Sequence, residues 1–538
     1  MNKIIFIITL SFMFTMQGFS QTKTINNVVY TYITDSWYYQ NGSTNLMVSK
    51  DRLKVLFSNK ISESEIQSAL DTYKCSIIAR DKLGVNILET SKSAEAIEVV
   101  EDMLNDTRIE MVDPVVEMRL IEIADDPYLP DQWYLEEEQI NGGIEIEEAW
   151  AKSVGSENIV IASYGSGVEI QHEDLVDNIW INQGEDVDED GEVWDLDDLN
   201  GVDNDENDFL DDLAGWHFGY GSDNDVFDDH QYGHGTLRAG VMVAKSNNGI
   251  GISGIAGGWG VQSGCKVMTI KLMYNTDEVL GDAIAYAVDN GAKILNLNVI
   301  ASPSSLNRAA LDYAVERNVL IVCGAGDNTG LIAFPASSNN TIGVGASLMK
   351  NASNEVLRAG FSNYGSPMLL LAPGDNILST GKNDSYMVGS GTSLSSSIVA
   401  AVSSLILSAH HDFDLDDVFK ALAITAMKNE PYVFSLNREF GMYSPDAGYG
   451  KVNANRALGI IDDISTNTVL AEGNYIANDV SVANSSILTL SPRFYFMKDA
   501  SLVIESGSEV IVNSGALLDA ESNANTIEVY GTLKLYDN

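Results

Sequence analysis

Two short stretches hold side chains that could carry out covalent hydrolysis. His234 lies in "GHGTLRAG", ahead of a helical stretch, and Ser393 lies in "GSGTSLSSSIVAAVSSLIL", at the start of an apolar helix. A serine at that place has its own backbone N–H and the helix N-terminus available to stabilise an oxyanion. Taken singly, the first stretch is better explained as a loop and the second as a helix cap. Hydrolytic chemistry therefore requires a fold that brings His234 and Ser393 together.

A second group of reactive side chains is acidic. The segment "DVDEDGEVWDLD" has oxygen ligands at loop positions 1, 3, 5 and 12, as calcium-binding loops do, and Gly191 at the sharp turn. These ligands are Asp186, Asp188, Asp190 and Asp197. The segment "DNDENDFLDD" is a poorer second copy, with Asp203, Asp205, Asn207 and Asp211. No lysine or arginine occurs from residue 185 to 229, so these carboxylates would repel one another without cations. We expect structural Ca²⁺ here; the alternative is a solvated acidic loop.

The elements that must position these residues alternate between strand and helix from about residue 126 to 462. Apolar, β-branched runs indicate strands, and the runs between them indicate helices. The strand runs are 158–164, 266–273, 292–300, 318–326 and 340–347, and the helical runs include 282–290 and 306–318. Continuous apolar strands alternating with helices favour an α/β fold with a parallel sheet covered by helices on both faces.

Two smaller units flank this domain. Residues 21–122 alternate strand and helix signals, including a capping box formed by Ser62 and Glu65, and predict a small α+β sandwich. From residue 463 to 538 the chain changes to β-rich repeats with a period of about eight residues, such as "ASLVIESG" and "SEVIVNSG". Such repeats predict a β-solenoid or a small β-sandwich, a module used more often for adhesion or spacing than for catalysis.

Composition and targeting signals favour an exported protein. Residues 1–20 have the features of a signal peptide: Lys3, an apolar run and a small-residue cleavage site. No later segment approaches the length of a membrane span, so we expect a secreted or surface-attached protein without a transmembrane segment. The formal net charge of −46 repels nucleic acid and anionic lipid and favours cations and basic partners. The three cysteines lie far apart in apolar contexts, which predicts free thiols.

The motifs around His234 and Ser393 resemble those of the subtilisin-like serine peptidases, or subtilases, whose triad runs Asp, His, Ser in chain order. The stretch "NNGIGISGIAGG" resembles the segment after the family's histidine helix. "FSNYGSP" and "LAPGDNILST" resemble the stretch before its serine, and "GYGKVNANRAL" its closing motif. The resemblance covers about residues 21–462. It implies a subtilisin-like fold, a polypeptide substrate or protein ligand, and an inhibitory prodomain at 21–122 that binds its own chain in cis.

Two positions depart from the family pattern in ways that oppose catalysis. The family's first motif aligns without a gap to "IVIASYGSGVEIQHEDL", and its aspartate position falls on Gly165. That aspartate fixes the histidine tautomer and stabilises the imidazolium. The family's oxyanion asparagine position falls on Asp327, where a carboxylate would oppose developing negative charge. A slip of one residue, to Asn328, would avoid this conflict.

Other departures are scattered around the same site. The strand that pairs with substrate in the family carries Asn298, Val299 and Ile300 in place of Ser-Leu-Gly, so we expect Ile300 to make the cleft wall bulkier. The family's histidine and valine after "HGT" appear as Leu237 and Arg238, and its proline and histidine after the serine as Ser397 and Ile398.

Three hypotheses of function follow. The first is an exported subtilase homologue with impaired catalysis that acts by binding or scaffolding. The alternative is an active serine endopeptidase that hydrolyses extracellular proteins through Ser393 and His234. In the third, the C-terminal repeats do the work and the subtilase fold carries them.

Overall fold

The computed structural model describes residues 22–116, 124–459 and 464–535, with short gaps inside each range, among them 91–95, 137–140 and 273–276. The expected signal peptide at 1–20 lies outside the described residues.

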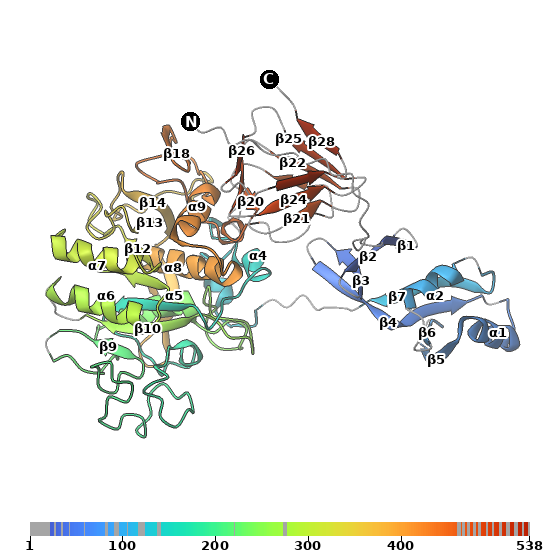
Figure 1. Ribbon diagram of the computed structural model, residues 1–538, viewed down its shortest axis with the longest axis horizontal. Helices are drawn as coiled ribbons and strands as arrows, with labels where there is room; N and C mark the ends of the chain where they lie inside the picture. Colours follow the sequence, from blue (N-terminus) through green and yellow to red (C-terminus); the bar gives the residue numbers. More distant parts are fainter. Residues whose placement is uncertain are drawn as a thin grey trace.

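A seven-stranded sheet forms the centre of the largest unit (Figure 1). Its strand order is β14-β13-β12-β11-β8-β10-β9, and every neighbouring pair is parallel. The strands are β8 (Val160–Gly165), β9 (Gly215–His217), β10 (Lys266–Lys271), β11 (Ile294–Leu297), β12 (Leu320–Gly324), β13 (Ile342–Ser347) and β14 (Met368–Pro373). Their apolar sequences suit strands that are buried on both faces. The predicted α/β fold with a central parallel sheet is confirmed.

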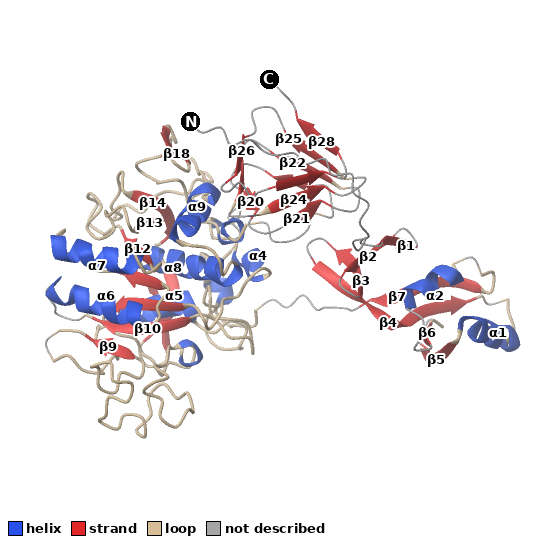
Figure 2. Ribbon diagram, viewed as in Figure 1, coloured by secondary structure: helices blue, strands red, loops and turns tan. Residues whose placement is uncertain are grey.

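Helices cover both faces of this sheet (Figure 2). The helices α5 (His234–Val243) and α8 (Thr392–Ala409) belong to one hydrophobic cluster, and α6 (Leu280–Asp289) and α7 (Ser305–Val315) belong to the other. Parallel strands all end at the same edge of a sheet, where loops and helix N-termini gather. The carboxyl end of β8 and the first turns of α5 and α8 therefore meet at one edge, which is where the candidate site lies.

Helix α8 is the central core helix of this unit. Among the described residues it is the one helix long and apolar enough to cross a membrane, but 78% of that stretch is buried inside the protein. Its apolar face packs over β11, β12, β13 and β14. Shorter elements complete the unit: α4 (Ile146–Trp150), α9 (Leu415–Thr425), α10 (Ala454–Ala457), β15 (Ile377–Gly381), β16 (Ser385–Gly389), β17 (Leu436–Arg438) and β18 (Gly441–Tyr443).

The N-terminal unit is an antiparallel sheet with two helices. Its strands are β1 (Thr22–Ile25), β2 (Val28–Ile33), β3 (Ser36–Asn41), β4 (Thr44–Phe57), β5 (Cys75–Arg80), β6 (Asn86–Thr90) and β7 (Ile109–Val116), and its helices are α1 (Glu63–Tyr73) and α2 (Ala96–Met103). The predicted capping box is present at the start of α1: Ser62 N–H donates to Glu65 Oε2 over 2.8 Å, and Glu65 N–H donates to Ser62 Oγ over 3.4 Å.

The C-terminal unit consists of three parallel ladders. They run β19-β22-β25-β28, β20-β23-β26 and β21-β24-β27. Each complete turn of the chain contributes one strand to each ladder. In the first ladder, Leu488 pairs with Val510 of the next turn, and Val510 pairs with Leu533 of the turn after that. Parallel pairing between successive turns is the pattern of a β-solenoid, whereas a sandwich is built from antiparallel strands. The strands are β19 (Thr468–Leu470), β20 (Asn474–Ile476), β21 (Val480–Val482), β22 (Ile487–Leu490), β23 (Arg493–Phe496), β24 (Ser501–Ile504), β25 (Glu509–Val512), β26 (Leu517–Ala520), β27 (Thr526–Val529) and β28 (Thr532–Leu535).

The three cysteines have free thiols, as predicted. Cys265 and Cys323 are buried in the parallel-sheet unit, and Cys75 is half-buried at the start of β5.

Candidate functional site

The serine and the histidine meet at the carboxyl edge of the sheet. His234 is the first residue of α5 and Ser393 is the second residue of α8, and His234 Nε2 lies 2.9 Å from Ser393 Oγ. The start of α5 fits there because its second residue is glycine: a Cβ on Gly235 would lie 1.8 Å from the carbonyl oxygen of Gly167, in the loop after β8. The fold thus brings together the two residues that hydrolysis requires.

Gly165, where the resemblance predicts the position of the family's aspartate, is the last residue of β8, and an arginine fills the space next to it. A Cβ on Gly165 would lie 2.3 Å from Nη2 of Arg238 and 3.3 Å from its Cζ. Arg238 stands four residues after His234 on α5, so both side chains leave the same face of the helix. Its side chain is only 1% exposed. Nη2 donates to the Tyr164 carbonyl over 2.9 Å, and Nη1 donates to Asn296 Oδ1 over 3.2 Å.

The surroundings of His234 oppose a positive charge on its ring. Burial, the cationic Arg238 and then His230 lower the pKa of His234 from its ordinary value to about 3. Burial also lowers the pKa of Arg238, to about 10, against the opposing effect of Asp228. Arg238 therefore stays charged near neutral pH while His234 stays neutral. Among the described residues, no carboxylate hydrogen-bonds to the Nδ1 atom of His234.

A buried polar network joins this arginine to the serine helix. Asn296 Oδ1 accepts from Arg238, from Ser397 Oγ over 3.0 Å and from Asn298 Nδ2 over 2.8 Å. Ser396 Oγ donates to Asn298 Oδ1 over 2.7 Å, and the hydroxyls of Ser396 and Ser397 each lie 2.9 Å from the carbonyl oxygen of Ser393. The side chain of Asn298, expected in the cleft, is therefore turned toward α8.

The other two expected cleft residues differ in exposure. Val299 is partly buried against the cluster that includes α6 and α7, whereas Ile300 is 74% exposed. Leu331, in the loop after β12, is 83% exposed. Two large apolar side chains thus reach solvent from segments at the carboxyl edge of the sheet.

Asp327 caps the helix that carries the serine. Its Oδ1 accepts a hydrogen bond from the backbone N–H of Thr392, the first residue of α8, over 2.8 Å. A Cβ on Gly391 would lie 3.3 Å from Asp327 Oδ2 and 3.2 Å from Ser393 Oγ, so the carboxylate and the hydroxyl border the same space. A carboxylate at a helix N-terminus is favourable for the helix. At this helix it places negative charge beside the serine.

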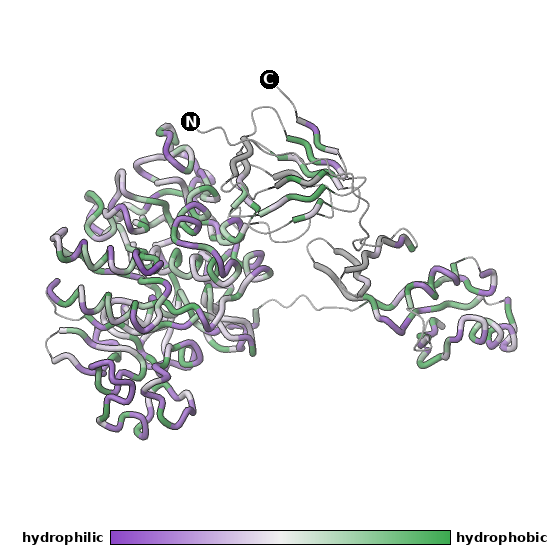
Figure 3. Tube along the Cα trace, viewed as in Figure 1, coloured by the Kyte–Doolittle hydropathy of each residue, from purple (hydrophilic) through white to green (hydrophobic). Residues whose placement is uncertain are grey.

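Carboxylates of the acidic loops form four groups among the described residues, of which two contain buried members. Figure 3 shows that the loops beside β9 are largely hydrophilic. In the first group, oxygens of the predicted Asp186, Asp188 and Asp190 lie within 4.8 Å of one another and of Asp198. The expected fourth ligand, Asp197, lies instead with Asp188 and Asp195. Asp198 is 1% exposed, and its Oδ2 atom and Oδ1 of Asp186 are buried without a hydrogen-bond partner.

The second group includes a residue that the sequence pattern missed. Glu185 is completely buried and lies with Asp203 and Asp205; its Oε1 accepts from backbone N–H groups, but its Oε2 has no partner. Of the two other predicted ligands, Asn207 contacts this group and Asp211 is bonded outside it. Asn207 Nδ2 donates to Asp205 Oδ2, and both carboxylate oxygens of Asp211 accept from the N–H of Gly201. Orphaned buried carboxylate oxygens in each of these two groups fit the oxygen coordination that Ca²⁺ prefers.

A buried lysine compensates part of the remaining acidic segment. Lys271, at the end of β10, has a side chain that is 1% exposed and lies 2.8 Å from Asp229 and 3.5 Å from Asp225. This ion pair ties the segment that leads to His234 to the carboxyl edge of the sheet.

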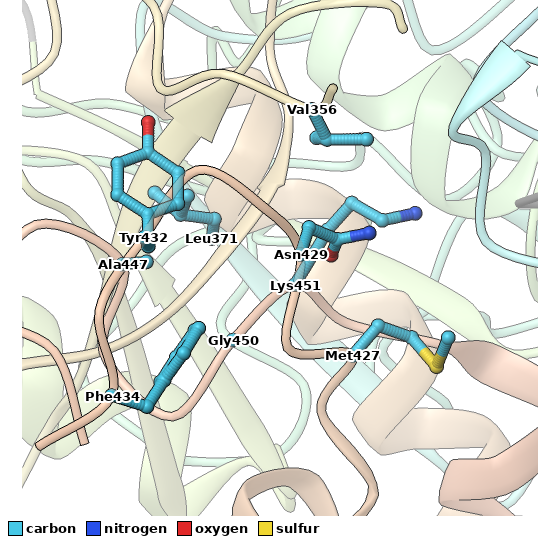
Figure 4. A pocket seen from close by; sticks show the side chains of 9 residues that line it. All are labelled: Val356, Leu371, Met427, Asn429, Tyr432, Phe434, Ala447, Gly450 and Lys451. Carbon is cyan, nitrogen blue, oxygen red and sulfur yellow. The ribbon is translucent and has the colours of Figure 1, made fainter. Parts of the chain in front are cut away.

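A small hollow lies away from the serine. Figure 4 shows side chains that surround it, including Tyr432, Phe434, Met427 and Lys451. It contains about 170 Å³ of unfilled space, none of which admits a sphere the size of water. A packing defect of this size is not a ligand site.

Comparisons with known proteins identify the family of the chain. The model of the subtilase family matches residues 156–443, more than half of the 538 residues. The chain is 29% identical over 420 residues to the halolysin-like extracellular serine protease Nep of Natrialba magadii, covering 76% of this chain and 67% of that protein. It is 26% identical over 448 residues to the extracellular basic protease of Dichelobacter nodosus, covering 77% and 68%.

A solved structure of a protease from Pseudoalteromonas arctica is 24% identical, with a TM-score of 0.47, and covers 62% of this chain and 98% of that one. The family match includes β8, both residues of the serine–histidine pair and the acidic loops. The chain belongs to the subtilase family.

Proposed function

We propose that this protein is an exported member of the subtilase family that is impaired as a peptidase and acts by binding or scaffolding polypeptides. The observation that carries this proposal is the environment of His234, where a buried guanidinium stands next to Gly165 and no carboxylate of the described residues bonds to Nδ1. The serine must pass its proton to the histidine, and the imidazolium that forms needs negative charge beside it. Removing the corresponding aspartate of subtilisin lowers turnover by about 3 × 10⁴-fold, a value established for that enzyme.

The carboxylate of Asp327, close to Ser393, is a second observation that supports the same proposal. The tetrahedral intermediate of peptide hydrolysis carries an oxyanion that donors near the nucleophile must stabilise. The carboxylate of Asp327 accepts the N–H of Thr392 and borders the space next to Ser393 Oγ. It therefore adds repulsion where a family member with asparagine would add a donor.

Exposed apolar side chains near the site support a binding role. The exposed side chains of Ile300 and Leu331 offer apolar contacts for an extended polypeptide. Relatives described as extracellular proteases, together with the signal-like residues 1–20, support secretion or attachment at the cell surface.

The second candidate is an active serine endopeptidase. One observation favours it: His234 Nε2 and Ser393 Oγ are already 2.9 Å apart, within hydrogen-bonding reach. A serine–histidine pair with a donor at the helix N-terminus retains some catalysis, and the losses at different positions of one site do not simply add.

We also propose that the acidic loops bind calcium. Asp186, Asp188, Asp190 and Asp198 would hold one ion, and Glu185, Asp203 and Asp205 a second. The bound cations would offset the repulsion among these carboxylates and order the loops that precede β9.

The fate of the prodomain tests the proposal on the natural chain. Active family members remove their own prodomain, so an impaired chain should keep residues 21–122 when it is secreted and purified. We expect the intact mass of the wild-type protein to include this segment and to match that of Ser393→Ala, apart from the substitution. A new N-terminus near Asp125 or Asp126, formed by the purified wild-type protein and absent from Ser393→Ala, would contradict the proposal.

A further inference from the structure

Arg238 is an unusual residue for the interior of this helix. Nine of the ten residues of α5 are buried, and Arg238 is the one with a charged side chain. Burying a guanidinium is costly unless its donors are satisfied. Two of its nitrogens bond to Tyr164 O and Asn296 Oδ1, but Nε is buried without a partner. The arginine therefore ties β8, β11 and α5 together and leaves one donor unsatisfied.

The same guanidinium occupies the space that a side chain at residue 165 would need. Its three nearest atoms, Nη2, Cζ and Nε, would lie 2.3, 3.3 and 3.9 Å from a Cβ on Gly165. Contact at 2.3 Å is far inside van der Waals distance, so an aspartate at residue 165 requires the guanidinium to move. An aspartate that did fit would pair with Arg238, and the arginine would compete with His234 for its carboxylate.

We propose that Arg238 is a positioning residue for the Ser393–His234 pair, coupled to Gly165, so that a carboxylate at residue 165 can support Ser393 only after Arg238 is removed. This inference rests on the proposed impairment of the site and explains why reverting Gly165 alone would not supply His234 with a carboxylate partner.

Other charged groups near α5 do not substitute for the missing carboxylate. Asp228 is buried and accepts from the N–H and hydroxyl of Thr236, with its other oxygen accepting from the N–H of His230. Lys271 of β10 is paired with Asp225 and Asp229. Of the charges that act on His234, Arg238 and His230 both oppose its protonation. Strand β15, which also packs on α5, has no titratable side chain.

Four full-length proteins test the coupling: wild type, Gly165→Asp, Arg238→Val and the double variant. Valine is the family's residue at the position of Arg238. The readout is the rate at which a fluorophosphonate labels Ser393, with Ser393→Ala as the blank and thermal unfolding as the check on folding. We expect Gly165→Asp to stay within about 3-fold of the wild type, Arg238→Val to change the labelling rate by less than the double variant does, and the double variant to exceed both single variants by about 10-fold or more. A Gly165→Asp protein that labels as fast as the double variant would overturn the inference.

A second measurement separates charge from packing and applies even if the double variant does not fold. Arg238→Met keeps much of the side-chain volume without the charge, whereas Arg238→Lys keeps a charge without the planar fork. We expect the NMR titration midpoint of the His234 ring to rise in Arg238→Met by part of the shift only, because burial is the largest cause and remains, and to stay low in Arg238→Lys. An unchanged midpoint in Arg238→Met would contradict the positioning role.

The two proposals fail in different ways. Fast labelling of the wild-type protein would refute the impaired function, and the ratio of the double variant to the two single variants would still report the coupling. Slow wild-type labelling with no gain in the double variant would refute the coupling and leave the impairment standing.

Discussion

Removal of calcium should lower the thermal unfolding midpoint of this protein by about 5 °C or more, because each of the two proposed ions, binding only the folded state at a hundred times its Kd, contributes about 2.7 kcal/mol. The effect should be large because Asp186, Asp188, Asp190 and Asp198 lie within 4.8 Å of one another. Without a cation, their mutual repulsion and the buried unpaired oxygens all act against the folded loop. Differential scanning calorimetry in calcium and in excess chelator measures the shift.

Two neighbouring substitutions supply a matched control for the calcium prediction. Asn at residue 198 keeps an oxygen that can accept the N–H of Val187, the bond that Asp198 Oδ1 makes over 2.7 Å, but loses the charge. We expect Asp198→Asn to reduce the calcium-dependent shift more than Asp197→Asn does. The reverse order would show that the loop binds calcium through the residue at the twelfth position of the sequence pattern. No shift in the wild-type protein would refute calcium binding by these loops.

The second large effect is expected at Asp327. Replacing it by asparagine should increase the labelling rate of Ser393 by roughly 10- to 100-fold, since one oxyanion donor is worth about 10² to 10³ in turnover in a complete site. Asparagine can still accept the N–H of Thr392 through Oδ1 while its Nδ2 faces the space beside Ser393. Asparagine and aspartate cap helices about equally well, so stability should change little.

Asp327→Ala is the control for the asparagine variant. It removes the negative charge without adding a donor and also removes the cap on α8, which costs about 1 kcal/mol of stability. We expect its gain in labelling to be smaller than that of Asp327→Asn. Equal gains would mean that charge removal alone matters, and no gain in either variant would contradict the role assigned to Asp327.

Much of the fold could be predicted because its signals are local. Runs such as "NIVIASY" and "KVMTIKLM" are too apolar for a one-sided sheet, and they form neighbouring parallel strands. The capping box at Ser62 and Glu65 marks the start of α1 because two side-chain hydrogen bonds depend only on a spacing of three residues. The pairing of His234 with Ser393 could be predicted only through the resemblance, since 159 residues separate them.

The parts that sequence reasoning missed depend on contacts between distant segments. Asp198, and not the neighbouring Asp197, lies in the first acidic group, and the sequence offers no local signal that distinguishes these two adjacent aspartates. Glu185 precedes the pattern and joins a group formed by a later loop. The inward turn of Asn298 requires partners on α8 that its own strand does not reveal.

Arg238 was visible in the sequence only as a departure from the family. A charged residue in an apolar helix ordinarily points to solvent, and nothing near it in the chain indicates otherwise. The structure shows that Arg238 lies next to Gly165. These two departures from the family pattern are 73 positions apart in the chain (238 − 165) but adjacent in the fold.

The most direct test of the impaired site is the labelling of Ser393 itself. The purified full-length protein is treated with a fluorophosphonate in calcium near neutral pH, beside Ser393→Ala and an active subtilase. We predict labelling at least about 10³-fold slower than that of the active enzyme, because His234 has no carboxylate partner among the described residues and the charge of Arg238 opposes its protonation. Rapid labelling of Ser393, absent from Ser393→Ala, would show that His234 activates the serine despite Gly165 and would contradict the account.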